Sequence, residues 1–434
     1  MTALFERELQ KGTGLPLLLL KKGILVANDQ LNEIITNAII DDYYYNAQNE
    51  GLRGDYLYEI VSIYSKKDEI FKKLVKIFEE MQGNESSEEQ IASFVSNMVK
   101  NNLYSLDKYY MKVDWYIIKY RAETSIIPGL GEIIKLDGIN AVKHYTKLIG
   151  KNLPNDNYLS EIFFENIIGY SPEEIKLILK KEEDNDINNY LEFIEMKPYW
   201  LSNMGENKRA SFEEIRQRYE KNRRRSPSLG GWLTHATDDE IQKVSDWYLT
   251  TKDTKLKSGI LKNFSKIKIR IDEDYLWKEL KRTRNLYYKS AIIEALIPFD
   301  NIAVKYFINS FFMINSYYNK EETKIAVLKA FIRFVDNEDE YLLEGFLDGL
   351  DSGGVYEILH FILESTRIKE LVFYPKVLHK LYEKNKCSCC RLKIVNEMLK
   401  FNCIDENLLA EIEYDCNWEI RKIANKLKSK KHFT

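Results

Sequence analysis

The segments that decide the fold lie in the second half of the chain, where one helical pattern recurs. It is clearest in YYKSAIIEAL at 287–296 and ETKIAVLKAF at 322–331. Each segment has a basic residue near its start, apolar residues at helical spacing and an apolar last residue. Four other segments share the pattern: KLKSGILKNF (255–264), VYEILHFILE (355–364), CRLKIVNEML (390–399) and EIRKIANKL (419–427). Because residues three and four positions apart share one face of a helix, the pattern predicts a set of similar amphipathic helices.

The spacing of these segments indicates how the helices are grouped. Their equivalent apolar positions are Ile260, Ile292, Val327, Ile358, Ile394 and Ile423, which are 32, 35, 31, 36 and 29 residues apart. Second helices fit between them, for example at 303–312 and 340–349. Periods of this length are typical of helix-pair repeats, which bury their apolar faces by stacking on one another. We therefore predict an all-α protein in which residues 236–434 form an α-solenoid.

The last repeat carries a family resemblance. In DCNWEIRKIANKL (415–427), Asp415, Ile420, Arg421 and Ala424 match the aspartate, apolar residue, arginine and small residue of HEAT repeats. The C-terminal half therefore resembles HEAT-like helical-repeat proteins, and QNEGLRGDYLYEI (48–60) resembles a segment of uncharacterised bacterial members. The resemblance implies stacked helix pairs and a protein-binding surface. It does not imply a particular partner, since HEAT arrays serve many unrelated ones.

The remaining sequence divides into two regions. Residues 1–205 contain helical periodicity without a regular repeat, so we expect an irregular helical region. Residues 206–235 change composition sharply: they are polar, then strongly basic, then rich in Gly, Ser and Pro. This composition predicts a basic helix followed by a loop that joins the two halves.

The bulk composition sets limits on the class of protein. The chain has 434 residues, of which 44% are hydrophobic and 30% charged, and this balance favours a folded chain over a disordered one. The net charge of -3 does not suit a chain that binds nucleic acid over its whole surface. The N-terminal sequence lacks a signal peptide's apolar core, and no run reaches the ~20 apolar residues of a membrane span. We therefore expect a cytoplasmic protein without a membrane segment.

A basic segment near the middle of the chain is the first candidate site. Its cations are Arg216, Arg218, Lys221, Arg223, Arg224 and Arg225, with Trp232 following. Such a segment suits phosphates or an acidic protein surface, and an aromatic ring can stack on a base. Cations are also favoured at the C-terminal end of any helix, so a purely structural role is the alternative.

A second candidate is the polar cluster of Gln48, Glu50, Arg53 and Asp55 in QNEGLRGDY. Two glycines predict a bend before a helix that starts near Asp55, which would act as its N-cap. The cluster is expected either to form a ligand or partner pocket or to fix one turn between helices.

Five cysteines lie in the last fifth of the chain, at Cys387, Cys389, Cys390, Cys403 and Cys416. Cys387 and Cys390 have the CxxC spacing of a zinc site, but no second close pair follows. We therefore predict structural thiols and no metal or other cofactor, with zinc binding and a redox role as the alternatives.

No catalytic or nucleotide-binding motif appears, and KGTG (11–14) and PGLGEI (128–133) read as turns. The sequence favours a non-catalytic scaffold or adaptor that binds a protein partner. An enzyme is the less favoured possibility, because catalytic residues can be dispersed along a chain. The alternative function is nucleic-acid binding by the basic segment, as in helical-repeat DNA glycosylases or defence and repair proteins.

Overall fold

The computed structural model describes most of the chain, and every regular element in the described residues is a helix. The described ranges are 1–41, 53–82, 87–120, 127–153, 169–195, 210–221, 229–265, 267–299, 303–304, 321–334, 340–369 and 375–431. The all-α class predicted from the sequence is confirmed for these residues. None of their helices combines the length and the apolar composition needed to cross a bilayer.

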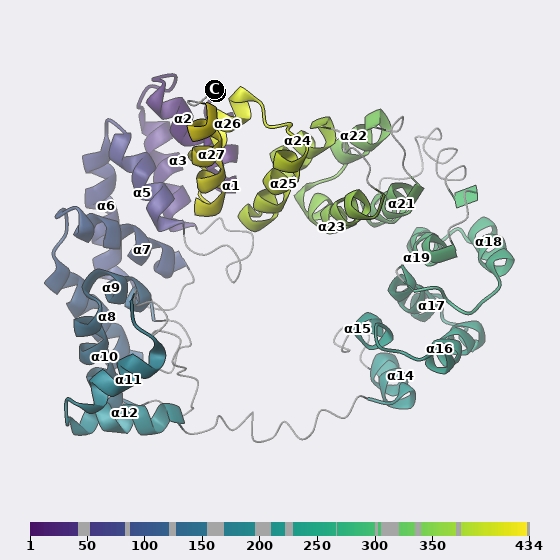
Figure 1. The fold of residues 1–434 in the computed structure, drawn as a ribbon, viewed down its shortest axis with the longest axis horizontal. Helices are drawn as coiled ribbons and strands as arrows, with labels where there is room; N and C mark the ends of the chain where they lie inside the picture. The colour runs from purple at the N-terminus through teal and green to yellow at the C-terminus, as the bar shows by residue number, and fades with distance from the viewer. Residues whose placement is uncertain are drawn as a thin grey trace. The chain divides into compact units, whose positions relative to one another are not determined.

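The chain forms two compact units (Figure 1). Unit 1 comprises Met1–Asn207, Lys386–Leu392 and Asp405–Thr434, and unit 2 comprises Lys208–Asn385 and Lys393–Ile404. The helices of unit 1 are α1 (Thr2–Lys11), α2 (Leu15–Lys21), α3 (Asp29–Ile40), α5 (Gly54–Ile63), α6 (Lys67–Glu80), α7 (Ser87–Lys100), α8 (Leu106–Tyr120), α9 (Leu130–Asp137), α10 (Ile139–Lys151), α11 (Pro172–Lys180), α12 (Asn185–Glu195), α26 (Glu406–Ile412) and α27 (Trp418–Lys431).

Unit 2 begins with α14 (Phe212–Lys221), α15 (Leu229–Leu233), α16 (Asp238–Thr250) and α17 (Thr254–Leu261), and continues with α18 (Glu273–Arg282) and α19 (Leu286–Leu296). It then includes α21 (Glu321–Phe334), α22 (Glu340–Asp348), α23 (Ser352–Lys369) and α24 (Pro375–Lys384). The helix α25 (Ser388–Lys400) contributes its first turn to unit 1 and the remainder to unit 2. The three regions predicted from the sequence do not coincide with these units and stay a prediction about domains.

Helix starts in both units follow ordinary capping chemistry. Before α3, the Asn28 side chain accepts a hydrogen bond of 2.8 Å from the Leu31 backbone N–H. Ser171 before α11 and Thr237 before α16 each form a reciprocal capping box with the glutamate three residues later. These contacts satisfy backbone donors that have no partner within the helix.

Unit 1 brings the two ends of the chain together. The N-terminal helices α1 and α2 lie beside α26 and α27 (Figure 1). Gly14, between α1 and α2, approaches the α26 backbone so closely that a Cβ atom there would lie 1.7 Å from the Glu411 carbonyl oxygen. The core of this unit continues through α5, α7, α8 and α10, where Phe94, Tyr109 and Tyr145 are fully buried.

Unit 2 contains four of the six recurring helices, whereas α25 is divided between the units and α27 belongs to unit 1. In order along the chain, α17 packs on α19, α19 on α21 and α21 on α23 (Figure 1). The equivalent apolar positions Ile260, Ile292, Val327 and Ile358 are all buried. The predicted helical periodicity is therefore present, and these side chains face the core of the unit.

The region 206–235 differs in part from the prediction. The basic helix is present as α14, but the expected Gly-rich loop ends in the short helix α15. Leu229, Trp232 and Leu233 of α15 are buried. We attribute this helix to that burial, which offsets the cost of about 1 kcal/mol that each helical glycine adds.

Candidate partner-binding surface

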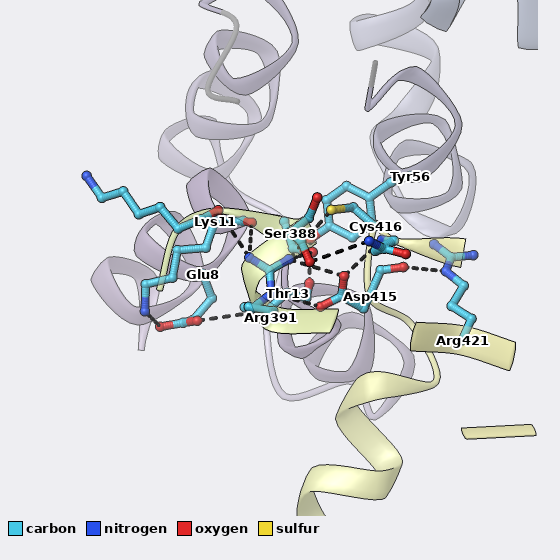
Figure 2. Close-up of polar contacts among 12 residues, drawn as sticks. Glu8, Lys11, Thr13, Tyr56, Ser388, Arg391, Asp415, Cys416 and Arg421 are labelled. Atoms are coloured by element: carbon cyan, nitrogen blue, oxygen red, sulfur yellow. Dashed lines mark hydrogen bonds and ion pairs between the residues drawn. The ribbon is translucent and has the colours of Figure 1, made fainter. Parts of the chain in front are cut away.

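A fully buried arginine connects the two ends of the chain within unit 1. The Arg391 side chain, on the first turn of α25, has no exposed surface, and Figure 2 shows the polar groups around it. Its Nε and Nη2 atoms donate to the two carboxylate oxygens of Asp415, each at 3.1 Å. Its Nη1 donates to the Lys11 carbonyl at 2.8 Å, and Nη2 also donates to the Gly12 carbonyl at 3.1 Å. This two-point pairing satisfies a charge that would otherwise be costly to bury.

The turn that receives Arg391 depends on glycine. Gly12 follows α1 with a φ of 72°, in the left-handed region that side chains disfavour. Its carbonyl also accepts the Cys416 backbone N–H at 2.9 Å. A Cβ at this position would lie 2.6 Å from the Cys416 sulfur, so both the backbone conformation and the packing require glycine here.

Further polar contacts fix the α1–α2 turn (Figure 2). Glu8, on the last turns of α1, is buried and accepts from Lys11 Nζ at 2.8 Å and from Thr13 Oγ1 at 3.2 Å. The Tyr56 hydroxyl of α5 donates to the Thr13 carbonyl at 2.7 Å. Burial raises the pKa of Tyr56 well above its ordinary value, so the phenol stays protonated and remains a donor. The turn is therefore held by both α1 and α5.

A second arginine attaches α27 to α5. Arg421 Nη1 donates to both carboxylate oxygens of Glu59, at 2.7 and 3.0 Å. Its Nε donates to the Asp415 carbonyl (Figure 2). Arg421 thus connects the Asp415 turn to α5 and fixes the orientation of Glu59, whose carboxylate lies at the edge of an open groove.

One groove of unit 1 has a volume of about 540 Å³ and runs across α2, α5, α6 and the residues that follow α7. We call it the α5 groove. Its apolar lining is Leu17, Tyr58, Ile63, Phe71 and Leu103, and its polar lining is Lys21, Glu59, Ser62, Lys67, Asp68 and Asn101. Its volume falls within the roughly 300–1,000 Å³ of sites that bind small ligands or anchoring side chains.

Aromatic packing gives the α5 groove a firm floor. The Tyr58 and Phe71 rings stack with centroids 5.9 Å apart, and Phe94 packs edge-on against Tyr58 at 5.7 Å. By contrast, Ile63 and Leu103 at the groove are 43% and 52% exposed. A rigid apolar floor with exposed apolar residues and a charged rim is the arrangement that anchors a partner's side chains.

The predicted polar cluster is only partly described by the structure. Gln48 and Glu50 lie outside the described residues. Arg53 is buried, and its Nη1 donates to the Gln10 carbonyl at 2.6 Å. The expected helix begins at Gly54 with Arg53 as its N-cap residue, so Asp55 lies in the first turn and does not cap it. The Asp55 carboxylate instead accepts from Asn97 Nδ2 at 2.7 Å. The described part of the cluster therefore fixes helix contacts.

The basic segment is also described in part, because Arg223, Arg224 and Arg225 lie outside the described residues. On α14, Arg216 pairs with Glu220 at 3.2 Å. Arg218 and Lys221 lie in the last turn of the same helix. Trp232 is buried, and its indole N–H donates to the Ala210 carbonyl at 2.7 Å. These contacts give Trp232 a packing role in unit 2, and a role in partner binding stays a prediction.

The cysteines lie in different surroundings. Cys387 and Cys390 are buried, and the Cys416 sulfur accepts from Arg391 Nη2 at 3.6 Å. Burial raises the pKa of the Cys403 thiol, which donates to the Met398 carbonyl. Within the ranges that the structure describes, no group of three or more His, Cys, Asp or Glu side chains is placed to hold a metal ion.

Sequence reasoning missed the α5 groove and the role of Arg391. Arg391 is the basic residue of the repeat CRLKIVNEML, and Asp415 and Arg421 belong to the HEAT-like pattern. The pattern marked these residues as structural, but periodicity does not indicate that they pair with residues near the N-terminus. Neither protein-family models nor curated proteins give a match to this chain.

Proposed function

We propose that this protein is a non-catalytic, helical-repeat scaffold that binds a segment of a partner protein in the α5 groove. The α5 groove carries the proposal, because it combines an aromatic floor with exposed Ile63 and Leu103 and a charged rim. The successive packing of α17, α19, α21 and α23 supports a HEAT-like array as the scaffold. A cytoplasmic location remains part of the proposal.

The experiment places a photo-crosslinking amino acid at Ile63 in the full chain and illuminates native lysate. We expect a defined adduct with one protein, identified by mass spectrometry. The matched control places the same group at Val26, which is 79% exposed and does not line the α5 groove. Ile63→Ser with Leu103→Ser should weaken the purified pair by roughly tenfold, or ~1.4 kcal/mol. Identical adducts at both positions, or unchanged affinity, would reject the α5 groove as the binding site.

Nucleic-acid binding by the basic segment is the alternative function and has a separate test. If DNA or RNA binds, the logarithm of the affinity should fall linearly with the logarithm of the salt concentration. Alanine at Arg223, Arg224 and Arg225 should reduce that slope, whereas the serine variants of the α5 groove should leave it unchanged. An absence of binding at low salt would remove this alternative.

A further inference from the structure

The helix α8 carries exposed apolar residues outside its buried face, on either side of Trp115, which is half-buried against the core of unit 1. Its buried face consists of Tyr109, Val113, Tyr116 and Ile117. Met111 and Ile118 are instead 70% and 56% exposed. Met111, Trp115 and Ile118 are spaced i, i+4 and i+7, so they lie along one face of the helix. We call these three residues the α8 stripe; none of them lines the α5 groove.

Two lysines place positive charge beside the α8 stripe. Lys112 Nζ lies 4.6 Å and Lys119 Nζ 4.4 Å from the centroid of the Trp115 ring. Lys112 donates to the carbonyls of Glu79 and Met81, and Lys119 donates to the side-chain oxygen of Gln82. All three acceptors are neutral groups, so these hydrogen bonds fix the ammonium groups without cancelling their charge.

Burial and charges of both signs act on the Lys112 ammonium. Burial is the main cause that lowers the pKa of Lys112, and the nearby ammonium of Lys119 lowers it further. The carboxylates of Glu88 and Glu79 act in the opposite direction. A carboxylate from a partner, placed beside Trp115, would reduce the repulsion between the two lysines.

The other flank of the α8 stripe has the opposite charge. At 100° per residue, Lys108, Lys112 and Lys119 lie on one side of the stripe, while Asp107 and Asp114 lie on the other. The Asp114 carboxylate is 2.8 Å from His144 Nε2. A uniformly anionic surface such as a bilayer would meet these carboxylates as well as the lysines. A partner helix that carries acidic residues along just one flank can place them beside the lysines and keep them away from Asp107 and Asp114.

We propose that the α8 stripe docks an amphipathic helix of a partner protein, with Asp or Glu side chains on the flank that meets Lys112 and Lys119. The proposal shares the protein-binding role proposed above but uses different residues. Trp115 is the fixed centre of the stripe, because the core, the two cations and the edge-on contact with Tyr116 at 5.2 Å hold its ring in place before binding. Exposed Met111 and Ile118 would be covered by the apolar face of the partner helix.

The test measures fluorescence anisotropy of a labelled amphipathic peptide added to the full chain. The peptide has leucines at i, i+3, i+4 and i+7 and glutamates along one flank, and a second peptide has lysines in place of the glutamates. We expect the acidic peptide to bind more tightly. Met111→Ser with Ile118→Ser should weaken it by about tenfold, and Lys119→Glu should shift the preference towards the basic peptide.

Matched controls lie on α11 of the same unit, where Leu177 is 60% exposed and the Lys180 side chain 56% exposed. Leu177→Ser and Lys180→Glu should leave both affinities unchanged, and thermal melting should show that all variants are folded.

Three outcomes would each overturn the proposal: failure of the acidic peptide to bind, equal affinity for the two peptides, or equal effects of the α8 and α11 variants. Stripe-dependent binding to phosphatidylserine vesicles without peptide binding would identify a lipid surface instead. The Ile63 and Leu103 variants should not affect this assay, so it can fail or succeed independently of the α5 groove.

Discussion

Unit 1 and unit 2 are built from the same kind of helix but are held together differently. In unit 2, the recurring helices α17, α19, α21 and α23 pack on one another in order along the chain. In unit 1, Arg391 binds the Lys11 carbonyl across 380 residues, and Arg421 binds Glu59 across 362. Neighbouring helices also stack in unit 1, as α5 does on α7 and α10 on α12, but its N- and C-terminal segments are joined in addition by these polar contacts.

This difference has an energetic basis. Apolar packing between sequence neighbours tolerates small changes in position, because burial depends mainly on area and is not directional. Bringing distant segments together costs more chain entropy, and a buried charge is costly unless its partners are well placed. Unit 1 should therefore be more sensitive than unit 2 to changes in a few polar residues.

The largest effect is expected from Arg391→Met, which leaves the buried Asp415 without its cation. Loss of one partner of a buried ion pair typically costs about 3–5 kcal/mol. Urea denaturation monitored by amide hydrogen exchange should show this loss in α1, α2, α26 and α27. Adding Asp415→Leu should restore much of the stability, since removing both charges also removes the unpaired one.

The exposed Lys393 on the same helix provides the control, and Lys393→Met should change stability little. The counterpart in unit 2 is Ile292→Ala, which removes a fully buried side chain at an expected cost of ~2–5 kcal/mol. Its increase in exchange should concentrate in α17, α19 and α21. A loss below about 1 kcal/mol for Arg391→Met would contradict the view that the Arg391 contacts stabilise the joined ends of the chain in unit 1.

A smaller effect is expected from Gly12→Ala, and the chain supplies a matched glycine. Gly12 and Gly23 have φ values of 72° and 65°, but only Gly12 has atoms within 4 Å of an added Cβ. Alanine at either position adds about 1–2 kcal/mol of backbone strain, and Gly12→Ala adds a clash with Cys416. The melting temperature of Gly12→Ala should therefore be lower than that of Gly23→Ala. Adding Cys416→Ala to Gly12→Ala should bring its melting temperature closer to that of Gly23→Ala. Equal decreases in melting temperature for the two glycine variants would contradict the close approach of Gly12 to Cys416.

The smallest effect concerns the capping box of α11. The Ser171 backbone N–H and hydroxyl hold the pKa of Glu174 below its ordinary value of 4.5. A carboxylate with a lowered pKa in the folded state stabilises that state above pH 4.5, and this contribution is lost as the pH falls through the folded-state pKa. The protection factors of amides in the first turn of α11, corrected for the intrinsic exchange rate at each pH, should therefore fall on acidification. Glu174→Gln should weaken that dependence, while Glu173→Gln should preserve it; identical profiles for all three proteins would argue against the cap.

Several parts of the structure could be predicted from the sequence. Helical periodicity identified the all-α class, the recurring helices and the buried positions Ile260 and Ile292. The turn at KGTG also matches the structure, since Gly12 ends α1, whereas in PGLGEI only Pro128 and Gly129 form a turn because α9 begins at Leu130. These features depend on local spacing and on backbone conformations that glycine favours, and both can be read along a single chain.

Other parts needed the tertiary structure. The helix α15 forms where composition predicted a loop, because burial of Leu229 and Trp232 is a long-range effect. The same applies to Arg53, which the sequence placed in a polar cluster and the structure places against the Gln10 carbonyl. The α5 groove combines side chains from α2, α5, α6 and the residues that follow α7, and no local pattern indicates that these residues meet.

The sequence by itself indicated the recurring helices, though not α15, and which faces of those helices are apolar, because both depend on spacing within a turn or two. Only the tertiary structure decided which charges pair and which apolar residues stay exposed. Arg391 and Asp415 become partners because the first turn of α25 and the turn between α26 and α27 enclose them together with the Gly12 turn, where water cannot solvate either charge. Met111 and Ile118 have the spacing of core residues, yet they remain exposed because the opposite face of α8 already packs against the core.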